Sequence, residues 1–89
     1  MRTTVFVKVY RHFEPKYETV RAKAIELFGE ERHERWIHRR VNESEYYLLG
    51  KDKTNDFILT GERYIAFDFT DKTDAMTFRL HIPCTIVLT

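Results

Sequence analysis

The residues best suited to chemistry are concentrated between Glu31 and Arg40, where the chain reads Glu-Arg-His-Glu-Arg-Trp-Ile-His-Arg-Arg. This segment places four arginines and two histidines around the only tryptophan of the chain. Guanidinium groups bind oxyanions in forked pairs, and an indole stacks on bases or fills pockets. The segment therefore predicts a surface that contacts phosphate or an acidic protein. We expect the contact residues to be Arg32, Arg35, Trp36, His38, Arg39 and Arg40.

The same residues also fit a purely structural interpretation. Trp36 and Ile37 are apolar enough for the core, and the arginines have Glu30, Glu31 and Glu34 nearby in the chain as partners. Surface ion pairs of this kind are common and contribute little to binding or stability. The sequence leaves both interpretations open.

No catalytic or metal-binding arrangement emerges from the other reactive residues. His33 and His38 are five positions apart, which places them roughly 140° apart around a helix, so they do not bind one metal ion together. Cys84 has no neighbouring cation to activate its thiol, and Ser44 is the only serine. We therefore expect a protein that is not an enzyme and that uses no metal ion and no cofactor.

Three acidic residues, Asp68, Asp71 and Asp74, surround the start of a predicted helix. Their oxygens are ligands that magnesium accepts. Acidic residues at a helix N-terminus also cap its free amide groups and complement its dipole. The capping interpretation requires no ion, and we favour it.

Composition indicates one small globular domain over residues 1–89, since 43% of the residues are apolar and 15% are aromatic. The net charge is +1, but residues 1–40 carry +4 and residues 41–89 carry −3, which favours one basic and one acidic face. A single cysteine indicates a reducing compartment. No apolar run reaches the roughly twenty residues of a membrane span. We expect a cytoplasmic protein that does not bind membranes.

Hydrophobic spacing predicts the elements of the first half of the chain. Apolar residues on both faces of residues 3–10 predict a central strand, and a helical stripe predicts a helix over residues 16–28. Gly29 either ends this helix or is a weak point inside a helix that runs on to about Asn42. Residues 30–41 fit either a helix or a strand. We favour a helix for at least the first half, because Glu and Arg are good helix formers. A helix would place Arg32, Arg35 and Arg39 on one stripe.

The second half is predicted to be richer in strands. A second helix is expected over residues 72–81, with Thr70 or Asp71 as its N-cap. Tyrosines at positions 10, 46, 47 and 64 lie on predicted strands and offer a further route to RNA, but they match no signature of the RNA-recognition domains. The predicted strands cover residues 46–49, 57–60, 63–69 and 85–88.

The order of these elements predicts an α+β fold. Two helices that share one face of an antiparallel sheet of four or five strands form the ferredoxin-like sandwich. Unpaired edge strands of such a small sheet are compatible with a homodimer.

Residues 69–80, Phe-Thr-Asp-Lys-Thr-Asp-Ala-Met-Thr-Phe-Arg-Leu, resemble a recurrent C-terminal segment of small accessory proteins of large tailed bacteriophages. In those proteins a strand runs into Asp-x-x-Asp-Ala-Met/Leu-x-Phe-Lys-Leu and a tryptophan usually follows. This chain has Arg79 in place of the lysine and no late tryptophan. The match covers about a dozen positions, mostly of helix packing, so no functional residue follows from it.

The resemblance implies a phage early protein without enzymatic machinery, acting in the host cell cytoplasm. Small host-takeover and anti-defence proteins of this group include inhibitors of toxin–antitoxin endoribonucleases. We therefore expect a non-catalytic phage accessory protein that inhibits a host defence factor, such as a toxin endoribonuclease, by direct binding. RNA is a candidate component of that complex. The alternative is a small RNA- or DNA-binding regulator that uses the arginine-rich segment 32–40.

Overall fold

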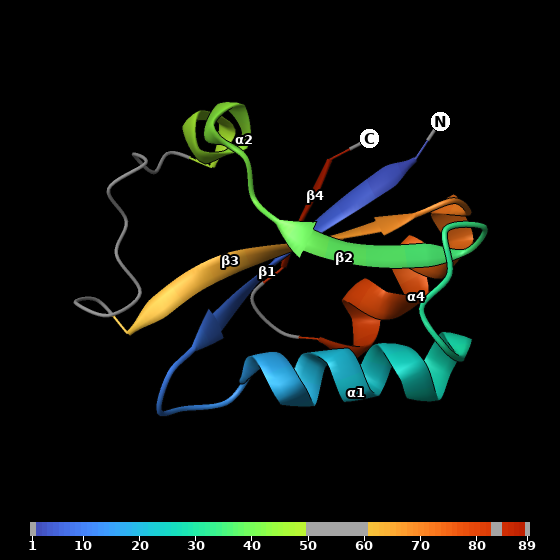
Figure 1. Cartoon of the computed structure of the whole chain (residues 1–89), viewed down its shortest axis with the longest axis horizontal. Coiled ribbons are helices and arrows are strands. Elements are labelled where there is room, and N and C mark those ends of the chain that lie inside the picture. Colours follow the sequence, from blue (N-terminus) through green and yellow to red (C-terminus); the bar gives the residue numbers. More distant parts are fainter. Residues whose placement is uncertain (1, 50–60, 83–84, 89) are drawn as a thin grey trace.

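The strands of this chain pair in one antiparallel sheet with the order β2-β3-β1-β4 (Figure 1). The computed structural model describes residues 2–49, 61–82 and 85–88. The elements in chain order are β1 (Thr3–Tyr10), α1 (Tyr17–Phe28), β2 (Trp36–Arg40), α2 (Glu43–Leu48), β3 (Glu62–Phe69), α4 (Lys72–His81) and β4 (Thr85–Leu88). The predicted α+β class is confirmed.

The two central strands, β1 and β3, are apolar on both faces because the sheet is covered on both sides. Val5 lies opposite Phe67 on one face, and Phe6 lies opposite Ala66 on the other. All four side chains are fully buried. Successive residues of a strand point to opposite faces, so each face needs its own cover.

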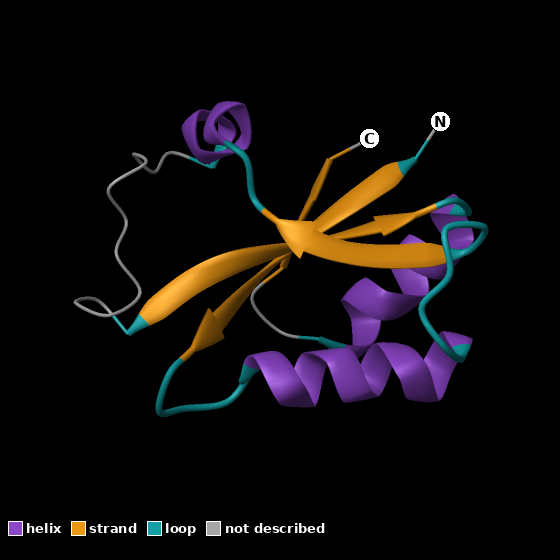
Figure 2. Ribbon diagram, viewed as in Figure 1, coloured by secondary structure: helices purple, strands orange, loops and turns teal. Residues whose placement is uncertain are grey.

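Helices α1 and α4 cover one face of the sheet, and α2 lies over the other (Figures 1 and 2). The larger core lies beneath α1 and α4, where Val20 and Ala24 of α1 and Phe78 of α4 are fully buried. A smaller core lies beneath α2. Its residues are Phe6, Val41 and Ala66, with Tyr46, Leu49 and Tyr64 packed against them.

The ends of the two longer helices follow the sequence signals. Gly29 ends α1 with a φ of 83°, and its N–H donates to the Ile25 carbonyl oxygen at 2.8 Å. Asp71 caps α4, because its carboxylate accepts from the backbone N–H of Thr73 at 2.8 Å. The predictions of both helices and of these two caps are confirmed.

Residues 36–40 form strand β2, as in the strand alternative, and residues 30–35 are not helical, so the preference for a helix in at least the first half of residues 30–41 was wrong. The glutamates and arginines of this segment have good helix propensity, but pairing with β3 overrides it. The strand buries the Trp36 side chain, while residues 30–35 form a turn between α1 and β2. Arg32 and Trp36 close this turn through two backbone hydrogen bonds of 3.0 and 2.8 Å.

The strand predicted over residues 46–49 is also wrong, because Glu43–Leu48 is a helix. The sequence does contain a helix-start pattern here, the capping box formed by Asn42 and Glu45. The Asn42 side chain accepts from the Glu45 N–H at 2.9 Å, and the Glu45 carboxylate accepts from the Asn42 N–H at 3.0 Å. The predicted strand over residues 57–60 and Cys84 lie outside the described residues.

Candidate functional site

Trp36 lies in the core rather than on the surface. Its side chain has no exposed area, its ring stacks on Phe67 with the centroids 6.1 Å apart, and its Nε1 donates to the Gly29 carbonyl oxygen at 3.1 Å. A ring without accessible area cannot stack on a base. The structural interpretation of Trp36 is therefore the one that this fold supports, in place of the predicted partner contact.

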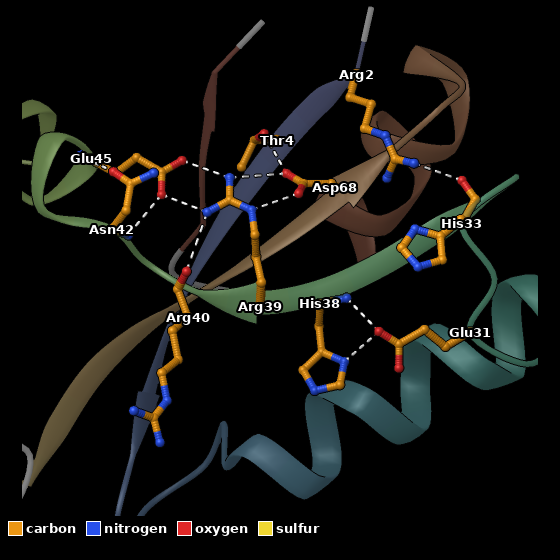
Figure 3. Close-up of polar contacts among 10 residues, drawn as sticks. All are labelled: Arg2, Thr4, Glu31, His33, His38, Arg39, Arg40, Asn42, Glu45 and Asp68. Carbon is orange, nitrogen blue, oxygen red and sulfur yellow. Dashed lines mark hydrogen bonds and ion pairs between the residues drawn. The ribbon is translucent and has the colours of Figure 1, made fainter.

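Arg39 is held by two carboxylates on the face of the sheet that α2 covers (Figure 3). Its Nε donates to Asp68 at 2.7 Å, and its two terminal nitrogens donate to the two Glu45 oxygens at 2.7 Å each. The Thr4 hydroxyl donates to the other Asp68 oxygen at 2.6 Å. Bonding to Glu45 and then to Asp68 raises the pKa of Arg39, and the bond from Arg39 lowers the pKa of Glu45. This guanidinium is engaged within the fold.

Arg35 joins the turn before β2 to both helices of the larger core. Its Nε donates to Asp74 of α4 at 3.1 Å, and its Nη1 donates to the Phe28 carbonyl oxygen at 3.0 Å. The guanidinium carbon lies 5.3 Å from the centroid of the Phe28 ring. About half of the Arg35 side chain remains exposed (49%), so a partner could contact only the part that Asp74 and Phe28 leave accessible.

The three aspartates near the start of α4 serve different residues. Asp71 caps the helix, Asp74 binds Arg35, and Asp68 binds Arg39. The described part of the chain holds no group of three residues able to bind a metal ion. The interpretation of these carboxylates as structural groups is the one supported by their contacts.

His38 is the centre of a hydrogen-bonded chain from Glu31 to Tyr17. Its Nδ1 lies 2.7 Å from the Glu31 carboxylate, which also accepts from the backbone N–H of His38 at 2.6 Å, and its Nε2 lies 2.9 Å from the Tyr17 hydroxyl. An ionised carboxylate only accepts, so Nδ1 carries the proton. In the neutral ring Nε2 therefore accepts, and the Tyr17 hydroxyl donates to it.

Arg32 and Arg40 keep exposed side chains, and within the described residues neither guanidinium forms a hydrogen bond or an ion pair. Arg40 follows Arg39 in the strand, so it points to the opposite face, away from the carboxylates that hold Arg39 (Figure 3). The shared stripe of Arg32, Arg35 and Arg39 that a helix would form does not exist. Of the predicted arginines, Arg32 and Arg40 are the most available to a partner.

A groove of about 760 Å³ lies beside the C-terminal end of β2. It brings together Arg40 and His38 from β2, Tyr17 from α1 and Tyr46 from α2. Its volume is in the range of pockets that hold small ligands. The complete lining consists of Tyr17, His38, Arg39, Arg40, Val41, Tyr46, Arg63, Tyr64 and Ile65.

Sequence reasoning found part of this groove. Segment 32–40 supplies His38, Arg39 and Arg40, but no role at the site was predicted for Tyr17 or Arg63. Tyrosines 46 and 64 were considered as RNA contacts on strands. The missing signal was the pairing of β2 with β3, which no local pattern reveals.

No described helix is long and apolar enough to cross a membrane. None of the family models, curated proteins and solved structures that were compared with this chain matches it.

Proposed function

We propose that this chain is a non-catalytic phage accessory protein that inhibits a host defence factor by direct binding, with RNA in the complex. A toxin endoribonuclease of a toxin–antitoxin system is the proposed type of target. The observation that carries the proposal is the groove at the end of β2, whose lining includes three tyrosines and Arg40, which has no ion pair among the described residues. The resemblance of residues 69–80 to phage accessory proteins supports the proposed origin.

The chemistry of the groove suits a partner that carries phosphate and flat rings. Arginine binds phosphate oxygens in a forked geometry, and tyrosine rings provide surfaces on which bases stack. Arg40 has no internal carboxylate among the described residues, in contrast to Arg39 and Arg35. A toxin ribonuclease with bound RNA offers such phosphates at its surface.

We also propose that the fold is the ferredoxin-like sandwich. The strand order β2-β3-β1-β4 with helices α1 and α4 on one face supports this assignment. Helix α2 is then an addition on the opposite face, which many sandwiches of this type leave open for binding. This addition narrows the open face and directs contacts toward the groove.

Affinity purification from host cells, followed by mass spectrometry, tests the proposed function. The tagged chain should recover one defined host protein, and ribonuclease treatment should weaken that recovery because RNA is part of the proposed complex. Arg40→Glu should abolish recovery, whereas Arg79→Glu, an exposed arginine of α4 outside the groove, should leave it unchanged. Equal recovery by wild type and Arg40→Glu would contradict the groove as the contact surface.

The second candidate function is a stand-alone RNA- or DNA-binding regulator. The tyrosines of the groove favour it, because stacking platforms bind single strands without a protein partner. The observed affinity of a regulator for an oligonucleotide should fall with salt, with a slope of roughly −0.7 for each phosphate contacted. Contacts confined to the groove would involve Arg40, so a shallow slope of one or two contacts is expected. No measurable binding in the absence of protein partners would remove this candidate.

A further inference from the structure

We infer that the groove binds a phosphodiester of single-stranded nucleic acid and that protonation of His38 strengthens this binding through the Tyr17 hydroxyl. The inference rests on the proposed function, because it concerns the same groove. It adds the chemical class of the ligand and a coupling between binding and pH. The groups that carry it are Arg40, Tyr17, His38 and Glu31.

The hydroxyl of Tyr17 has a defined direction when His38 is neutral. Glu31 fixes the ring proton on Nδ1, so Nε2 accepts and the Tyr17 O–H points at the imidazole. The hydroxyl then presents only oxygen lone pairs to the groove that Tyr17 lines. A phosphate oxygen meets an acceptor there, which is unfavourable.

Protonation of His38 reverses this direction. Both ring nitrogens then donate, Nδ1–H to Glu31 and Nε2–H to the Tyr17 oxygen. The Tyr17 proton is released from the imidazole and can be donated to a phosphate oxygen beside Arg40. The groove therefore gains one donor and one positive charge in the same step.

The surroundings of His38 allow this change without a new structure. The structure places Glu31 from the turn before β2, Tyr17 from α1 and the uncharged Phe67 of β3 against its ring, and Arg40 of β2 lines the same groove. A bound phosphodiester adds negative charge to the groove, so ligand binding and proton uptake by His38 support each other.

Calorimetric titration of the full chain with a uridine hexanucleotide that lacks a terminal phosphate tests the inference. Its phosphodiesters keep one negative charge each across the range used, so the ligand itself does not titrate. At constant ionic strength the dissociation constant should fall about tenfold between pH 7.5 and 5.5, the effect of one hydrogen bond to a charged group. Equal affinity at both pH values, or no binding at either, would overturn the inference.

Three variants separate the hydroxyl from the charges. Tyr17→Phe keeps the ring and should reduce the gain at pH 5.5 to less than about threefold, whereas Tyr47→Phe, an exposed tyrosine outside the groove, should keep it. Arg40→Gln should weaken binding at both pH values and preserve their ratio. A Tyr17→Phe protein that is folded by circular dichroism and still shows a tenfold gain would disprove the role of the hydroxyl.

The pH-dependent binding of the oligonucleotide and the proposed inhibitor function can be tested separately. A host partner lost on Arg40→Glu but retained by Tyr17→Phe at both pH values, with no pH-dependent oligonucleotide binding, would leave the proposed function standing and remove the inference. Oligonucleotide binding with the expected pH dependence, without recovery of any host protein, would support the inference and contradict the proposed inhibitor function.

Discussion

At the scale of single residues, Arg39 and Arg40 are neighbours of the same type with different roles. Arg39 neutralises two carboxylates, of which Asp68 is only 6% exposed, whereas Arg40 forms no ion pair within the described residues. Arg39→Leu leaves both carboxylates without their cation, so we expect the free energy of unfolding to fall by about 2–3 kcal/mol. Urea denaturation measures this loss. Arg40→Leu is the matched control and should change stability by less than about 0.5 kcal/mol.

The ion pair between Arg39 and Glu45 should also make stability depend on pH. The bond from Arg39 lowers the folded-state pKa of Glu45, so its contribution is complete above the unfolded-state pKa and is lost as pH falls through the folded-state value. We expect the free energy of unfolding to decrease from roughly pH 5 downward. Urea denaturation between pH 6 and 3 should show a smaller decrease in Arg39→Leu than in wild type. Parallel curves would contradict the assignment of this dependence to Glu45.

The residue types of the site could be predicted from sequence, but their partners could not. Segment 32–40 was correctly identified as rich in arginine, and burial of Trp36 was one of the two interpretations left open. The carboxylates nearby in the chain were proposed as the partners of the arginines. The structure instead pairs Arg39 and Arg35 with residues of the second half, Asp68 and Asp74. Pairs so distant in sequence depend on strand register, which one chain does not reveal.

At the scale of elements, the connection between α1 and β2 depends on Gly29. Its φ of 83° with a ψ of −169° is a backbone conformation almost restricted to glycine. A Cβ at this position would meet no atom within 4 Å, so the cost of Gly29→Ala comes from the backbone alone. We expect a loss of about 1–3 kcal/mol in thermal or urea unfolding. The neighbouring Glu30→Ala, at an exposed position, should be nearly neutral, and an equally neutral Gly29→Ala would refute the strain.

The elements differed in how well local patterns predicted them. Strands β1 and β3 and helices α1 and α4 follow strong periodicity and were predicted within a few residues. The short elements β2 and α2 were mispredicted, because five or six residues carry little periodicity. Helix propensity favoured a helix for the first, and the second was predicted as a strand over residues 46–49. Pairing with β3 makes β2 a strand, and the capping box of Asn42 starts α2 as a helix.

The outer edge of β2 is protected against pairing with another chain. The Glu31 carboxylate accepts from the backbone N–H of His38 at 2.6 Å, and Arg32 pairs with the backbone of Trp36. The carbonyl oxygen of Arg40 accepts from the Arg39 side chain at 3.3 Å. Edge strands with occupied backbone groups resist strand addition. A homodimer, if one forms, is therefore expected to use a surface other than this edge.

At the scale of the whole molecule, the basic and acidic halves of the chain are not fully separated into two faces, because some of their charges pair with each other. Arg35 and Arg39 of the basic half bind Asp74, Asp68 and Glu45 of the acidic half. These contacts bring opposite charges of the two halves together within the fold. Arg32 and Arg40 of the arginine-rich segment remain without an ion pair among the described residues.

The helices on the two faces of the sheet should also differ in their stability against local opening. Helices α1 and α4 pack on the larger core, whereas α2 is a helix of six residues without a buried side chain of its own. Its attachment depends on partly buried Tyr46 and Leu49 and on the bonds from Arg39 to Glu45. Local openings occur where few apolar contacts hold an element. We therefore expect α2 to open without unfolding of the sheet.

Native-state hydrogen exchange tests this expectation. The amides of Tyr46 in α2 and of Leu49 at its C-terminal end donate to the carbonyl oxygens of Asn42 and Glu45, and they should exchange with a lower opening free energy than the amides that pair β1 with β3. Their exchange should also respond little to low concentrations of urea, because a local opening exposes little surface. Arg39→Leu should lower the opening free energy of α2 further, since it removes the ion pair that holds the helix to β2. If α2 and β1 instead show the same opening free energy and the same urea dependence, the sheet and α2 unfold as one cooperative unit.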